Sequence, residues 1–190
     1  MFEKTREYVK TLGLPEGDLN DLPTSDARYP DGTYFRIEVP TVNSAAAVAA
    51  LLETSDKMGI TINRVTETYG MFRHTRQELK EYCRLCNEYG AELLLSVGPR
   101  ATYDTGSTVL SPQGVRISYR LRGMEQVLRA VEDIKRGIDI GCRSFLIYDE
   151  GMLWLVAQMR KDGELPSDIV FKLSAHLGHC NPVSFKVLEG

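Results

Sequence analysis

Three polar side chains alternate along an otherwise apolar stretch near the C-terminus, in the sequence FKLSAHLGHCNP. Lys172, Ser174 and His176 are two residues apart, so on a β-strand all three project from one face. A lysine that is desolvated on such a face loses its proton more readily and can form a Schiff base with a carbonyl substrate. The alternative is an ion pair with Glu38 or Glu150 that keeps the lysine charged. The residue types leave both alternatives open.

The two histidines of this stretch are candidates for acid–base or metal chemistry. His176 and His179 fall at the end of the expected strand and just after it. With Glu38, Asp149 and Glu150 at other strand ends, they could hold a divalent metal through nitrogen and carboxylate ligands. No HExxH or comparable ligand motif accompanies them, and a histidine could equally cap the loop or hydrogen-bond a carboxylate. The candidate catalytic residues are therefore Lys172, His176 and Glu38, with a metal as the alternative.

A second candidate region follows another apolar run, in the sequence SVGPRATYDTGS. Gly98 permits a close approach of the backbone, and Arg100 could bind a carboxylate or phosphate through two hydrogen bonds. The segment 99–122 is longer than most loops, which favours a lid or an anion-binding loop over a solvated flap. The candidate substrate-binding residues are Arg100, Gly98, Arg36, Glu150 and Ser174.

Asp149 and Glu150 are adjacent, so on a strand they point to opposite faces and do not form an acid–base pair. One of the two can instead cap the helix that follows.

The pair Cys83 and Cys86 matches C-x-x-C, but it lies at helical spacing, and no second pair completes a four-cysteine site. We therefore interpret the C-x-x-C pair as buried helix packing and expect reduced cysteines.

Apolar periodicity and turn residues predict strands that alternate with helices from residue 34 onward. A capping box, Thr75 to Glu78, marks the start of one helix, and Gly141 marks the end of another. The expected strands are 34–40, 60–67, 91–98, 144–150 and 169–176. The expected helices are 2–12, 43–59, 75–90, 123–140 and 152–162, and residues 181–190 supply barely two turns of one more helix. Strands separated by helices predict βαβ units and a parallel sheet, so the fold class is α/β.

Two architectures accommodate five βα units: an open, doubly wound sheet and a (β/α)8 TIM barrel that lacks three units. Central strands of an open sheet are apolar on both faces, whereas here one face is polar in several strands. A polar face is typical of a barrel interior near its functional rim, so we favour an incomplete barrel. Residues 1–32 are then an N-terminal covering segment, and residues 33–190 form the partial barrel domain.

Several stretches carry a resemblance to a known group: MFEKTREYVKTLGLPEGDLNDLPTS, SVGPRATYDTG, RLRGMEQVL, YDEGMLWLVAQMRKDGELP and KLSAHLGHCNP. Over nearly the whole chain the sequence resembles bacterial TIM-barrel proteins that are peptidase family U32-like. The resemblance implies the first five βα units of a longer barrel. The family includes collagenase-like proteases and proteins of RNA or quinone hydroxylation, some with an iron–sulfur cluster. Its signature, a Glu- and Gly-rich segment with two nearby cysteines, is absent from this chain.

Composition and charge argue against nucleic-acid binding, membrane insertion and export. The chain has 190 residues and a net charge of −3, so a general attraction to nucleic acid is not expected. No apolar run approaches the roughly 20 residues needed to cross a bilayer, and the N-terminus lacks the pattern of an export signal. We expect a cytoplasmic protein with a small-molecule substrate. A homo-oligomer, or a partner that supplies the missing half of the barrel, is also expected.

Together these observations predict an enzyme, a hydrolase or lyase, that acts on a small anionic or carbonyl-bearing substrate at the C-terminal rim of the barrel. Two alternatives stay open: a metal-dependent barrel enzyme with histidine and carboxylate ligands, and a non-catalytic ligand-binding barrel.

Overall fold

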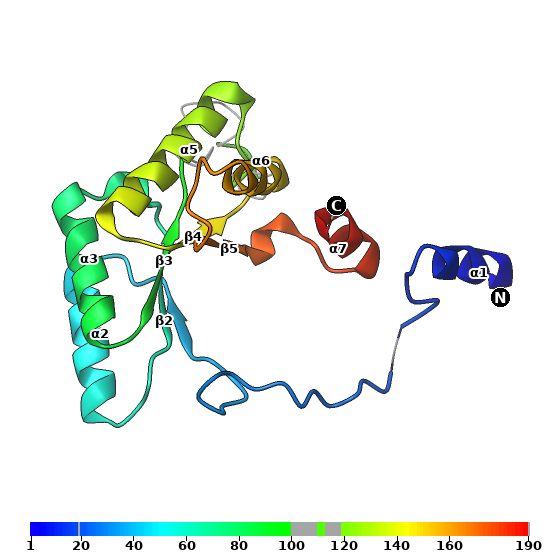
Figure 1. The fold of residues 1–190 in the computed structure, drawn as a ribbon, viewed down its shortest axis with the longest axis horizontal. Helices are drawn as coiled ribbons and strands as arrows, with labels where there is room; N and C mark the ends of the chain where they lie inside the picture. The colour runs from blue at the N-terminus through cyan, green and yellow to red at the C-terminus, as the bar shows by residue number, and fades with distance from the viewer. Residues whose placement is uncertain (19, 100–109, 113–118, 190) are drawn as a thin grey trace. The chain divides into compact units, whose positions relative to one another are not determined.

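A computed structural model describes residues 1–18, 20–99, 110–112 and 119–189 (Figure 1). The chain folds as two units, one of which is Arg36–Leu177 and the other Met1–Phe35 together with Gly178–Gly190. The smaller unit contains the helices α1 (Glu3–Thr11) and α7 (Pro182–Glu189). Its N-terminal part ends close to the predicted boundary at residue 32. The last helix, which we had assigned to the barrel domain, belongs to this smaller unit instead.

The larger unit is built on a five-stranded sheet in which all strands are parallel and lie in sequence order. This confirms the α/β class. The strands are β1 (Glu38–Pro40), β2 (Arg64–Glu67), β3 (Glu92–Ser96), β4 (Ser144–Ile147) and β5 (Val170–Leu173). In the register of the first three strands, Glu38 lies opposite Arg64, which in turn lies opposite Glu92.

Helices connect the strands, and their ends carry the expected caps. Thr75 and Glu78 form the predicted capping box, because each side chain bonds the backbone N–H of the other residue. Gly141, at a φ of 111°, ends the longest helix in a conformation that favours glycine. The helices are α2 (Ala45–Lys57), α3 (Arg76–Glu88), α5 (Gly123–Ile140) and α6 (Glu150–Lys161), with short 3-10 turns η1 (Met71–Arg73) and η4 (Ala175–Leu177).

The main core lies between these helices and one face of the sheet. Helix residues such as Leu52 and Ile134 pack there with strand residues such as Leu95 and Phe145. The neighbouring strand positions, which point to the opposite face, form a separate small cluster: Leu94, Leu146 and Tyr148, with Tyr119 against them. In the larger unit, helices thus cover one face of the sheet, and the other face carries polar side chains.

The observed strands are shorter than predicted, because alternation continues beyond the hydrogen-bonded ladder. Tyr34 and Phe35, which we had placed on the first strand, lie outside β1 and in the smaller unit.

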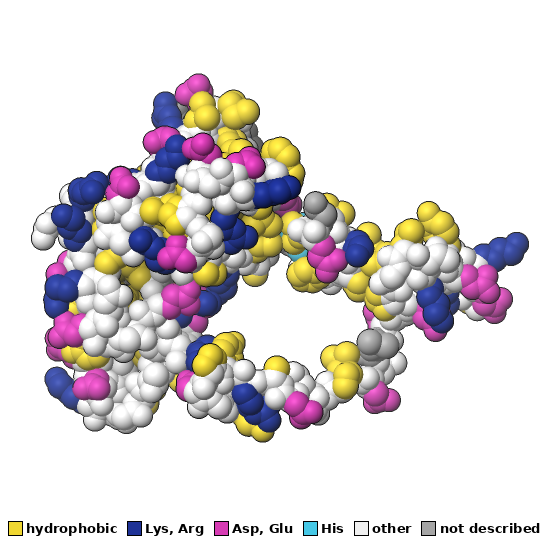
Figure 2. All heavy atoms as spheres, in the orientation of Figure 1, with side chains coloured by type: hydrophobic (Ala, Val, Ile, Leu, Met, Phe, Trp, Pro, Cys, Tyr) yellow, Lys and Arg dark blue, Asp and Glu magenta, His cyan; other side chains and the backbone are white. Residues whose placement is uncertain are grey.

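Over the surface visible in Figure 2, Lys and Arg side chains are interspersed with Asp and Glu. No helix in the described ranges is long and apolar enough to span a bilayer.

Candidate functional site

The first and last strands of the sheet meet through their side chains. Lys172 Nζ on β5 lies 2.5 Å from Glu38 Oε2 on β1. Neighbouring strands are about 4.8 Å apart, so in a flat sheet these two strands would be separated by roughly 19 Å. A lysine and a glutamate side chain together span only roughly 11 Å. The sheet must therefore curl, with its polar face on the inside of the curve.

Further charged and hydroxyl groups line this concave face. Glu38 also accepts hydrogen bonds from Arg64 Nη1, at 3.3 Å, and from Thr66 Oγ1, at 2.7 Å. Arg64 Nη2 lies 2.5 Å from Glu92 Oε2, and Ser144 Oγ donates to Glu92 Oε1 at 2.5 Å. The charges of the two cations and two carboxylates cancel, so the face is polar without a net charge.

The pKa values of this network reflect the pairing. Burial raises the pKa of Glu38, but the hydrogen bonds from Lys172 and Thr66 outweigh it, so the net pKa of this carboxyl is lowered. Burial lowers the pKa of Arg64, and the bonds to Glu92 and Glu38 more than offset this, so its pKa is raised. Glu38 is thus held as a carboxylate. Of the two alternatives for Lys172, the geometry matches the ion pair with Glu38.

The predicted rim residue Ser174 lies directly after β5, and His176 is the middle residue of η4. Ser174 Oγ lies 3.2 Å from His176 Nδ1 and accepts the backbone N–H of His176 at 3.2 Å. The imidazole is exposed, and it stacks on the ring of Tyr119. Lys172 lies on β5, but the strand ends at Leu173, so Ser174 and His176 follow it and the prediction of one shared strand face for all three residues was wrong.

Asp149 and Glu150 have separate roles at the end of β4. Asp149 caps α6, because its carboxylate accepts the N–H of Met152 at 3.0 Å. Glu150, predicted to bind substrate, forms an ion pair with Arg120. Of the two adjacent acids, Asp149 is thus the one that caps the helix.

The other predicted substrate-binding residues are less closely grouped. A Cβ atom on Gly98 would lie 1.9 Å from the ring of Phe72, so this glycine admits a phenylalanine of the same chain. Arg36 lies two residues before β1 and is half-buried. Arg100 lies outside the described residues. The structure therefore brings together two pairs of predicted residues, Lys172 with Glu38 and Ser174 with His176.

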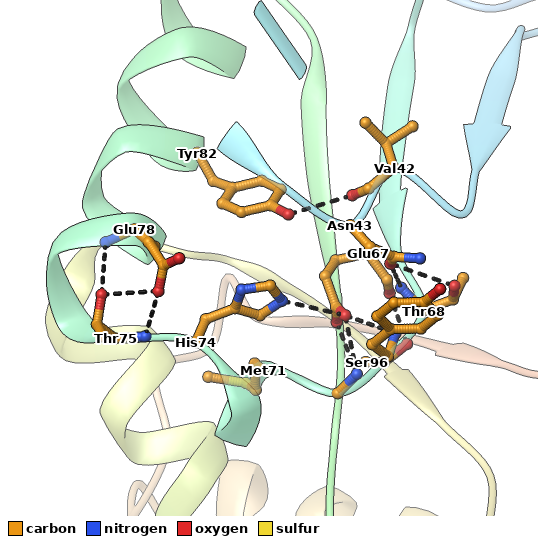
Figure 3. Close-up of polar contacts among 12 residues, drawn as sticks. Val42, Asn43, Glu67, Thr68, Met71, His74, Thr75, Glu78, Tyr82 and Ser96 are labelled. Carbon is orange, nitrogen blue, oxygen red and sulfur yellow. Dashed lines mark hydrogen bonds and ion pairs between the residues drawn. The ribbon is translucent and has the colours of Figure 1, made fainter. Parts of the chain in front are cut away.

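Sequence reasoning missed a buried acid–histidine pair on the helix-covered face (Figure 3). The Glu67 carboxylate is fully buried and accepts the N–H groups of Tyr69, at 2.5 Å, and Gly70, at 2.8 Å. His74 Nε2 lies 3.3 Å from Glu67 Oε1, and its ring meets Tyr82 edge to face. Glu67 satisfies the donors of the turn after β2, so we interpret the pair as a structural support.

Two hydroxyl groups on the concave face were also missed. Ser96 Oγ lies 2.6 Å from the carbonyl oxygen of Glu67 and 3.0 Å from Tyr148 Oη. A carbonyl only accepts, so Ser96 donates to Glu67, and Tyr148 must donate to Ser96. The alternation that selected Lys172 would also have placed Tyr148 on this face, beside Leu146.

In the described ranges, no group of three or more His, Cys, Asp or Glu side chains lies close enough together to bind a metal ion. Cys83, Cys86 and Cys142 are buried thiols, which agrees with helix and core packing, and Cys180 is exposed. The metal-dependent alternative therefore has no supporting ligand set in this part of the chain.

Comparison with protein-family models and with curated protein sequences gives no match for this chain. The candidate site is therefore interpreted from its own geometry.

Proposed function

We propose that this chain supplies five βα units of a (β/α)8 barrel and resembles the peptidase family U32-like proteins. The curvature supports this proposal. In a closed barrel of eight strands, the first and fifth strands lie on opposite sides, and their inward side chains meet in the middle. Lys172 and Glu38 are in this relation, since one is on β5, the other on β1, and they touch. A helical layer on a single face of the sheet agrees with the same architecture.

The proposed activity is that of a hydrolase or lyase acting on a small anionic or carbonyl-bearing substrate. The observation that carries it is the position of Lys172 and His176 on the concave face, at and just after the carboxyl end of β5. Active sites of (β/α)8 barrels lie at this end of the strands. An imidazole there suits general acid–base catalysis, because its ordinary pKa lies near neutral pH.

Lys172 acts in this proposal as a charged ammonium group. It pairs with the Glu38 carboxylate, and an ammonium group has no lone pair with which to attack a carbonyl carbon. An ammonium has three N–H donors, and the Lys172 side chain is 39% exposed, so donors remain for a carboxylate or a polarised carbonyl. This role replaces the Schiff-base alternative.

The proposal is tested with pyruvate and inorganic phosphate as probes, by titration calorimetry on the whole chain. Lys172→Met should abolish the heat of binding of at least one probe, whereas Lys161→Met, at the last residue of α6, should leave it unchanged. Wild-type protein that binds neither probe, or Lys172→Met that binds as the wild type does, would overturn the proposal.

Borohydride reduction in the presence of pyruvate, followed by peptide mass spectrometry, decides the role of the lysine. The ammonium role predicts an unmodified Lys172 peptide. A covalent adduct on Lys172 would contradict it and restore the Schiff-base mechanism.

A further inference from the structure

Three aromatic rings meet beside the carboxyl ends of β4 and β5. The rings of Tyr119 and His176 are nearly parallel, with centroids 4.4 Å apart and an interplanar angle of 7°. Tyr119 also stacks on Tyr148, with centroids 5.0 Å apart and an angle of 24°. The ring centroids of Tyr148 and His176 are only 6.2 Å apart. Two rings stacked on opposite faces of Tyr119 would be farther apart, because two stacking distances would separate them. Tyr119 therefore covers both neighbours with the same face.

The segment that carries Tyr119 is tied to both strand ends. Arg120, the next residue, pairs with Glu150 after β4 and donates to the carbonyl oxygen of Leu177 after β5, at 3.4 Å. The N–H of Leu121 donates to Asp149 Oδ2 at 3.2 Å. Three consecutive residues thus contact the same rim, and the tyrosine ring is held over the imidazole by its neighbours as well as by its own stacking.

We propose that Tyr119 is a positioning residue for His176. This inference rests on the proposed function, in which His176 is the acid–base group. Stacking against Tyr119 fixes the plane of the imidazole, and the contact of Nδ1 with Ser174 Oγ fixes its rotation within that plane. The other ring nitrogen, Nε2, then points in one direction, as a proton-transferring group requires. An exposed histidine on a one-turn helix would otherwise sample several rotamers.

The tyrosine hydroxyl has no part in this inference, which depends on the aromatic face. Tyr119→Phe keeps the ring, and Tyr119→Leu replaces it with an apolar side chain of smaller area. Tyr8→Leu, on the exposed face of α1, is a matched control for the loss of one tyrosine. One stacked aromatic pair is a small part of the stability of a folded domain, so the folded state should tolerate the loss of this pair.

The experiment is proton NMR of the imidazole groups in the full chain, which has three histidines. His176→Gln assigns the resonances of that residue. In the wild type, the ring current of Tyr119 should shift them upfield, and cross-relaxation should connect the two rings. Tyr119→Leu should move the His176 resonances downfield and remove the cross-relaxation, whereas Tyr119→Phe and Tyr8→Leu should leave both in place.

Resonances of His176 that stay unshifted in Tyr119→Leu would overturn the positioning role. If that variant does not fold, the wild-type spectrum decides, because absent cross-relaxation between the two rings excludes the stack. These readouts need no substrate, so the positioning inference and the proposed function fail separately. With a bound probe, loss of binding in Tyr119→Leu but not in Tyr119→Phe is the expected functional result.

Discussion

Ser96 Oγ donates a 2.6 Å hydrogen bond to the main-chain carbonyl of Glu67, whose own side chain lies on the opposite face of the sheet. On the concave side, Ser96 also accepts from Tyr148, which belongs to the ring cluster around His176. On the helix-covered side, the Glu67 carboxylate holds the turn after β2 (Figure 3). One residue of β2 thus connects the candidate site with a buried polar cluster on the other face.

Glu67→Ala should destabilise the protein by about 2–4 kcal/mol, because the buried N–H group of Gly70 and the partly buried N–H group of Tyr69 would lose their acceptor. Glu67→Gln keeps an acceptor oxygen and should cost less. Urea unfolding followed by circular dichroism measures both, and Glu53→Ala, at an exposed position of α2, is the control. A Glu67→Ala variant as stable as the control would contradict the supporting role.

Lys172→Met should lower the free energy of unfolding by about 1 kcal/mol. The loss is small because Glu38 keeps its contacts with Arg64 and Thr66, and because the pair is partly exposed to solvent. Adding Glu38→Gln to Lys172→Met should recover part of the loss, which a double-mutant cycle measures. Zero coupling between the two positions would show that the contact between β1 and β5 contributes nothing to stability.

The buried carboxyl of Asp133 should make stability depend on pH. Burial raises its pKa to about 6, and the ion pair with Arg136 offsets this only partly, while the charge of Glu67 adds to it. The folded state then binds this proton more tightly than the unfolded chain does, so stability falls as the pH rises from about 4 through about 6.

Asp133→Asn removes this titration. The variant should gain stability relative to the wild type between pH 5 and pH 7, by on the order of 1 kcal/mol. The measurement is urea unfolding of both proteins at the two pH values. An equal difference between them at both pH values would refute the raised pKa.

Gly98→Ala should destabilise the protein by about 1–3 kcal/mol, because the new methyl group would clash with the ring of Phe72. Adding Phe72→Ala should relieve part of that clash. Gly151→Ala, in the first turn of α6, is the comparison: its methyl group would lie 3.2 Å from Asp149 Oδ1, a milder approach, so it should cost less than Gly98→Ala. Thermal unfolding reports all of them, and equal melting temperatures for Gly98→Ala and the wild type would exclude close packing against Phe72.

Iodoacetamide should alkylate one of the four cysteines in the native protein. Cys180 is exposed, whereas burial raises the pKa of Cys83, and raises the pKa of Cys86 and Cys142 to about 12. Thiolates react, so the buried thiols should stay unmodified until urea unfolds the chain. Peptide mass spectrometry identifies the site, and rapid native labelling of Cys83 or Cys86 would revive a reactive role for the C-x-x-C pair.

The sequence predicted the order of the elements well, because local signals determine where helices begin and end. The capping box at Thr75 and the glycine at 141 marked helix ends that the structure confirms. Strand ends were less predictable, since alternation continues where the ladder stops. Residues 34–37 alternate like a strand, yet β1 begins at Glu38.

The candidate site was predictable where it depends on one strand and less so where distant segments meet. Period-two alternation selected Lys172, Ser174 and His176 as candidates, but it did not predict that β5 ends before Ser174. The curvature of the whole sheet determines which carboxylate reaches Lys172. The sequence alone therefore could not show whether Glu38 or Glu150 is its partner. The stack of Tyr119 on His176 joins two residues that are far apart in the sequence, and no local pattern encodes that contact.

The sequential strand order bears on how the chain folds. Each strand pairs with the one before it, so every ladder closes a single βα unit, and contact order within the sheet stays low for a parallel topology. Lys172 and Glu38, by contrast, are 134 residues apart. During synthesis the units can dock one after another, and this ion pair becomes available only when the fifth strand emerges from the ribosome.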